Sequence, residues 1–167
     1  YLYNYQGRYA EAEQLYKRSL TLYEKALGPE HPDFALNLNN LANLFDNQGR
    51  FAEAETLYKR SLVILEKAFG QEHPSRATSL GNLGLSYKNQ GRYAEAEQLY
   101  KRSLAIKEKL LGPEHTDVAT SLNNLANLYD NQGRYAEAEL LYKRSLTINE
   151  KAFGKDHPGA ALILNNL

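Results

Sequence analysis

Apolar residues recur along this chain with the period of an amphipathic helix. Between Pro32 and Asn47, Leu38, Leu41, Ala42 and Phe45 occupy positions i, i+3, i+4 and i+7 of one helical face. A second apolar face of the same kind extends from about residue 51 to residue 68. No sustained period-two alternation, which would indicate strands, occurs in the sequence. The pattern therefore predicts helices over 32–47 and about 51–68, and an all-α fold.

Both helical patterns repeat every 42 residues. The string Gln-Gly-Arg, followed by an aromatic residue and Ala-Glu-Ala-Glu, occurs four times, with its glycines at Gly7, Gly49, Gly91 and Gly133. A second series has the same step of 42 and consists of Gly28, Gly70, Gly112 and Gly154. Because the chain-breaking residues gather at these two places, each period contains two uninterrupted helices. We name the helix before a Gly49-type glycine helix A, and the helix before a Gly70-type glycine helix B.

Neither helix can bury its apolar face alone, so stacked helix pairs must share one continuous core. Small residues that recur on both helices, Ala42 on helix A and Ala54 on helix B among them, let neighbouring backbones approach closely. We expect residues 1–167 to form a single array of four 42-residue helix-turn-helix repeats. The array is expected to begin and end inside a helix A, as a fragment of a longer array.

The repeated residues resemble the tetratricopeptide repeat (TPR) family. That family has a Leu-Gly pair and an aromatic residue on helix A, then small and aromatic residues on helix B, and the corresponding residues here are Leu83, Gly84, Tyr87, Ala96, Tyr100 and Ser103. The 42-residue unit is similar to the kinesin-light-chain-like subclass. The resemblance implies an α-solenoid of antiparallel helix pairs in a right-handed superhelix, with helix A lining a concave groove that binds partner peptides.

Charge and composition exclude several classes of function. Lys plus Arg and Asp plus Glu are both 20, so a strongly basic nucleic-acid or membrane-surface binder is not indicated. The chain has no cysteine and no apolar run long enough to cross a membrane. We expect a cytoplasmic protein that contacts neither nucleic acid nor membrane.

The sequence shows no set of residues arranged for catalysis, so we expect a protein that is not an enzyme and carries no cofactor. The histidines, which follow the second glycine series, are His31, His73, His115 and His157. Equivalent positions of stacked repeats lie about 10 Å or more apart, too far to share a metal ion. We interpret these histidines as residues that cap and pack the connectors.

Asparagine is unusually frequent on helix A although it is a mediocre helix former. An amide both donates and accepts hydrogen bonds, so a row of amides can hold a peptide backbone whatever its side chains. The candidate groove residues are Asn39, Asn43, Asp46, Asn82, Lys88, Asn123, Asn127 and Asp130. For the row of Asn40, Asn82, Asn124 and Asn166, contact with a ligand and hydrogen bonding to a neighbouring helix stay open as alternatives.

Two functions are consistent with these patterns. The first is a non-enzymatic protein-interaction scaffold that binds a partner peptide in the helix A groove. The alternative is a structural array whose copies stack head to tail into filaments, because the terminal half helix would expose apolar residues to water. The residues expected to form such ends are Tyr1, Leu2, Tyr3, Leu162, Ile163, Leu164 and Leu167.

Overall fold

Every regular element that the computed structural model describes, in residues 9–155 and 157–166, is an α-helix. The A helices are α3 (Pro32–Asn47), α5 (Pro74–Asn89), α7 (Thr116–Asn131) and α9 (Pro158–Leu164). The B helices are α2 (Tyr9–Leu27), α4 (Phe51–Phe69), α6 (Tyr93–Leu111) and α8 (Tyr135–Phe153). The predicted ranges 32–47 and 51–68 therefore match α3 and α4 to within one residue. Each of the helices described is too short or too polar to span a membrane.

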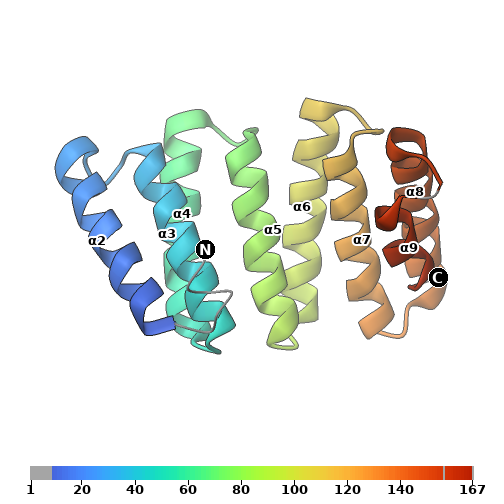
Figure 1. Cartoon of the computed structure of the whole chain (residues 1–167), viewed down its shortest axis with the longest axis horizontal. Helices are drawn as coiled ribbons and strands as arrows, with labels where there is room; N and C mark the ends of the chain where they lie inside the picture. Colours follow the sequence, from blue (N-terminus) through green and yellow to red (C-terminus); the bar gives the residue numbers. More distant parts are fainter. Residues whose placement is uncertain (1–8, 156, 167) are drawn as a thin grey trace. The chain divides into compact units, whose positions relative to one another are not determined.

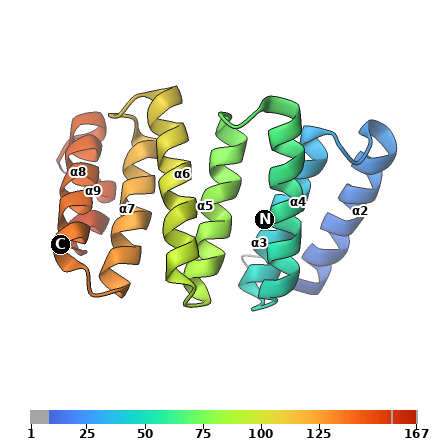
Figure 2. The ribbon, with the colours of Figure 1, turned by 180° about the vertical axis from the view of Figure 1, so that it is seen from behind.

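The chain divides into two compact units, Tyr1–Ser86 and Tyr87–Leu167, and each is described by itself. In the first unit, α3 packs against both α2 and α4 (Figures 1 and 2). In the second unit, α7 packs against α6 and α8, and α9 packs against α8. Within each unit the connections between consecutive helices are short, so the helix pairs α2–α3, α3–α4, α6–α7, α7–α8 and α8–α9 are antiparallel.

Each unit has its own apolar core between an A helix and the following B helix. In the first unit the buried cluster is Phe34, Ala35, Leu38, Ile64 and Leu65, and in the second it is Val118, Ala119, Leu122 and Ile148. The small serine side chains of helix B allow the two helices to approach closely. The hydroxyl of Ser61 donates to the carbonyl oxygen of Ala35, and that of Ser145 donates to the carbonyl oxygen of Ala119, each at 2.8 Å. The two cores thus use equivalent positions 84 residues apart.

The Gly49-type turns end the A helices. Gly49 has φ of 72°, and the amide of Arg50 donates to the carbonyl of Phe45 while the amide of Gly49 donates to that of Asp46. These two bonds form a Schellman motif, whose left-handed residue is favourable only for glycine. Because Arg50 is also the N-cap of α4, only three residues separate the two helices and the chain reverses direction over them.

The four histidines cap the A helices, as the sequence analysis expected. The Nδ1 atoms of His31, His73, His115 and His157 accept the backbone N–H two residues later at 3.0–3.2 Å. These bonds require the proton of each neutral imidazole to lie on Nε2. Among the described residues, no group of His, Cys, Asp and Glu is placed to hold a metal ion.

The residues expected at the ends are partly outside the described chain. Tyr1, Leu2, Tyr3 and Leu167 lie outside the described residues, as does the side chain of Leu162. Leu164 is 53% exposed, as expected, whereas Ile163 is only 5% exposed. The expectation of an exposed Ile163 was wrong because α9 packs this side of the helix onto α8.

Candidate functional site

In the first unit, the buried amide of Asn39 connects two A helices. Asn39 lies on α3 and is 5% exposed. Its Nδ2 donates to the hydroxyl of Ser79 on α5 at 3.0 Å, and its Oδ1 accepts from Nδ2 of Asn82 at 3.4 Å. Both ends of the amide are therefore engaged inside the unit, and half-buried Asn82 is engaged with it.

Asp46 lies about two turns after Asn39 along α3 and is half-buried. Burial raises the pKa of its carboxyl, while a hydrogen bond from Ser86 opposes that rise. The Ser86 hydroxyl on α5 donates to Oδ1 of Asp46 at 2.7 Å. Asp46 thus presents a partly desolvated negative charge beside the α3–α5 contact.

Asn43 connects helix A to helix B rather than to another helix A. The buried Tyr58 on α4 donates its hydroxyl proton to Oδ1 of Asn43 at 2.6 Å. Burial, with Asp46 nearby, raises the pKa of Tyr58, so the hydroxyl remains a donor at neutral pH. Half-buried Asn43 retains its Nδ2 donors for other contacts.

Asn127 is the residue of the second unit that is equivalent to Asn43, and it forms hydrogen bonds with several side chains. The ammonium of Lys88, at the end of α5, donates to Oδ1 of Asn127, and the Tyr142 hydroxyl of α8 also hydrogen-bonds to Asn127. Burial lowers the pKa of Lys88. Asp130, one turn along α7, is exposed, so a positive and a negative charge lie on the same unit.

Asn123 is the counterpart of Asn39 but has a different environment. Its Oδ1 is buried and has no hydrogen-bond partner among the described residues. Asn123 borders a cavity of about 220 Å³, which is lined by Ala119, Thr120, Asn123, Ser145, Asn149, Gly159 and Ile163. A second cavity on this unit, of about 150 Å³, does not include Asn123. The donor to Oδ1 of Asn39 is Asn82, and the residue equivalent to Asn82 is Asn166, which is exposed and lies after the end of α9.

Comparison with known proteins agrees with this architecture. A family model described as Tetratricopeptide repeat matches residues 1–67, 33–109 and 75–151. The chain belongs to the tetratricopeptide repeat family. A search of curated proteins gave no match for this TPR chain.

Solved structures resemble the TPR chain over most of its length. The crystal structure of BtubC (BKLC) from P. vanneervenii has a TM-score of 0.82 and 26% identity over 92% of this chain. This chain spans 61% of that protein's chain. Two further crystal structures are of a Podosopora anserina putative kinesin light chain with nearly identical TPR-like repeats, and one of the two is of a substituted variant. Each has a TM-score of 0.81 and 30% sequence identity to this chain. The matched region covers 96% of this chain and 76% of the other.

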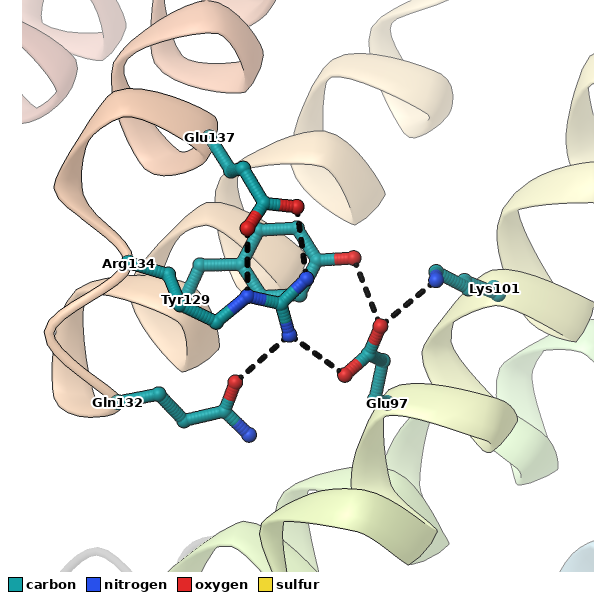
Figure 3. A network of polar contacts seen from close by, with 6 residues as sticks. All are labelled: Glu97, Lys101, Tyr129, Gln132, Arg134 and Glu137. Atoms are coloured by element: carbon teal, nitrogen blue, oxygen red, sulfur yellow. Dashed lines mark hydrogen bonds and ion pairs between the residues drawn. The ribbon is translucent and has the colours of Figure 1, made fainter.

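The TPR turns also contain an arginine clasp that the sequence analysis did not identify (Figure 3). Arg134 lies over the Tyr129 ring at 3.7 Å and binds Glu137 through two 2.7 Å bonds. Its Nη1 also reaches Oε2 of Glu97, on α6, at 2.8 Å. Arg50 makes the same contacts in the first unit, with its Nη1 2.6 Å from Oε2 of Glu13.

The carboxylate at the centre of the second clasp is strongly stabilised in its ionised form. Burial by itself would raise the pKa of Glu97, but hydrogen bonds from Lys101, Arg134 and Tyr129 outweigh it and lower the pKa to about 2. The Tyr129 hydroxyl donates to Oε1 of Glu97 at 3.0 Å. A constant spacing of 37 residues between glutamate and arginine was the sequence signal for these clasps.

Proposed function

We propose that this TPR chain is a non-enzymatic scaffold that binds a peptide segment of a partner protein at the polar positions of its A helices. The contacting residues are Asn43, Asp46 and Asn82 in the first unit, and Lys88, Asn123, Asn127 and Asp130 in the second. Asn39 does not contact the peptide in this proposal, because its buried amide is hydrogen-bonded to Ser79 and Asn82; it holds Asn82 in place instead.

The observation that carries this proposal is the buried, unpaired Oδ1 of Asn123. Buried polar atoms in folded proteins nearly always have hydrogen-bond partners, and an acceptor without one needs an explanation. A peptide N–H or a side-chain donor entering the adjacent cavity would pair with it. The cavity, at about 220 Å³, is large enough for a small side chain.

The charges of the second unit indicate what kind of peptide would bind. Lys88 is partly desolvated and Asp130 is exposed. A peptide carrying only one sign of charge would be attracted by one of these residues and repelled by the other. We therefore expect a partner segment of mixed or neutral charge that is held largely through its backbone.

A display library of random peptides, followed by titration calorimetry of the selected sequences, tests this function. Asn123→Leu should weaken binding at least about fivefold, since a lost buried hydrogen bond costs about 1–3 kcal/mol. Gln98→Leu, the same kind of substitution at an exposed position of α6, should leave affinity unchanged. Failure to select any sequence, or equal affinity for the wild type and Asn123→Leu, would contradict the proposal.

We also propose a second function, head-to-tail association of copies. The observation that favours it is the 53% exposure of Leu164, an apolar residue of α9 whose burial against another chain would be favourable. Sedimentation velocity over a hundredfold range of concentration should show a rising sedimentation coefficient. A constant monomer value throughout that range would exclude this function.

A further inference from the structure

A pocket of acidic and aromatic side chains lies on the second unit, between α7, α8 and the turn that follows α9. It has a volume of about 150 Å³ and is lined by Asp130, Tyr135, Ala138, Glu139, Tyr142 and Asn166. Tyr135 is 68% exposed, and Glu139 is 55% exposed. The pocket therefore combines two carboxylates with the exposed ring of Tyr135, a combination that suits a cationic group.

Two other repeats show which cation this pocket would take. Glu139 is equivalent to Glu97 and Glu13, which lie 42 and 126 residues earlier. Those two carboxylates receive the guanidinium groups of Arg134 and Arg50 at 2.8 and 2.6 Å. Both are 19% exposed, compared with 55% for Glu139.

The remaining contacts of Glu139 leave room for such a group. Glu97 shares its carboxylate between Lys101 at Oε1 and Arg134 at Oε2 (Figure 3). Glu139 binds the equivalent Lys143 through Oε1 at 2.5 Å, which leaves its Oε2 in the position that takes the arginine at Glu97. The same chemistry, a charge-assisted bond to a planar guanidinium, is therefore available at Glu139.

Another arginine, Arg8, has the same residue types at the same sequence spacings as Arg134. Arg134 has Tyr129 five residues before it, Gln132 two before it and Glu137 three after it, and all three contact it (Figure 3). The same residue types stand at the same spacings around Arg8, namely Tyr3, Gln6 and Glu11. Arg8 lies outside the described residues, and only its sequence neighbours are compared with those of Arg134.

We propose that the pocket at Glu139 binds Arg8 of a second copy of this chain. This proposal rests on the head-to-tail association proposed above. The Arg8–Glu139 ion pair would fix which surface of one copy contacts which surface of the next. The resulting contact joins two different surfaces, so each copy can accept one neighbour and be accepted by another.

Charge exchange followed by sedimentation velocity tests the pair. Glu139→Arg and Arg8→Glu should each reduce the association constant at least tenfold when studied alone. An equimolar mixture of the two variants should recover association to within about threefold of the wild type, because each interface then again joins opposite charges. The controls Glu114→Arg and Arg18→Glu make the same charge changes at exposed positions and should behave like the wild type. Far-ultraviolet circular dichroism confirms that every variant folds.

The outcomes separate the pocket from the association itself. If the wild type associates and both single variants associate equally well, copies meet through other surfaces and the Arg8–Glu139 pair is wrong. If both variants lose association and the mixture does not recover it, the two residues do not face each other, and the pair is again wrong. A wild type that stays monomeric excludes both the pair and the association.

Discussion

At the residue scale, one position of helix A has opposite environments in the two units. Asn39 is satisfied at both ends of its amide by Ser79 and Asn82. Asn123, its equivalent, has a buried Oδ1 without a partner among the described residues. The same residue type therefore stabilises one unit and leaves an unpaired acceptor in the other.

Replacing these two asparagines by leucine should have different effects on stability. Asn39→Leu should lower the free energy of unfolding by about 1–3 kcal/mol, because it leaves the polar groups of Ser79 and Asn82 without their partner. Asn123→Leu should cost clearly less, because its Oδ1 contributes no bond. Urea denaturation followed by circular dichroism measures both values, and equal costs would contradict the difference in environment.

The clasp carboxylate Glu97 should make stability depend on acid pH. Its pKa falls from the ordinary 4.5 to about 2 in the folded protein, so its contribution is fully present above pH 4.5 and is lost as pH falls towards 2. Asp46 acts in the opposite direction, because burial raises its pKa. Comparing the wild type with Glu97→Gln isolates the clasp: the urea midpoints of the two should differ most at pH 7 and converge near pH 2. A difference that stays constant with pH would show that the Glu97 charge does not matter.

At the scale of single helices, the ends of the A helices depend on side-chain and glycine caps rather than on helix propensity. His115 accepts the amide of Asp117 at 3.1 Å at the start of α7. Gly133, with φ of 74°, ends the same helix in a Schellman motif. These caps repeat with the 42-residue period, which keeps the A helices within the same bounds in each full repeat.

Removing one histidine cap should destabilise its helix measurably. His115→Ala should cost about 0.5–2 kcal/mol, the usual range for the loss of an N-cap acceptor. His115→Asn supplies an alternative acceptor and should recover most of that loss. Chemical denaturation compares the three proteins, and an alanine variant as stable as the wild type would show that the Nδ1 bond contributes nothing.

At the scale of the whole molecule, the same contacts recur in both units at an offset of 84 residues. Ser61 and Ser145 bond to equivalent carbonyls, and Arg50 and Arg134 to equivalent glutamates. In such repeat proteins stability is close to a sum of repeat and nearest-neighbour terms. The number of repeats should therefore set the stability of the chain more than any single residue does.

Inserting a second copy of residues 51–92 directly after Arg92 tests this additivity. The insertion preserves the 42-residue period and adds one B helix, one A helix and their contacts. The guanidinium midpoint and the melting temperature should both rise, with a larger denaturant dependence because more surface is exposed on unfolding. Unchanged midpoints would mean that the repeats unfold independently of their neighbours.

The helices, their ends and the family could be predicted from the amino-acid sequence. Helical periodicity and a regular series of glycines and histidines act within one or two turns of chain, so the bounds of α3 and α4 could be predicted to within one residue. The polar candidates of helix A could also be named, because asparagine in a helix is conspicuous.

The hydrogen-bond partner of each polar residue could not be predicted in this way, because it depends on how the helices pack. Oδ1 of Asn39 is engaged because packing places Asn82 within reach of it, whereas Oδ1 of Asn123 has no partner among the described residues although the equivalent Asn166 is present in the sequence. The clasp likewise needs Glu97 and Arg134 to meet across two helices although 37 residues separate them. A hydrogen bond depends on which groups packing brings within about 3 Å, and helical periodicity alone does not specify that arrangement.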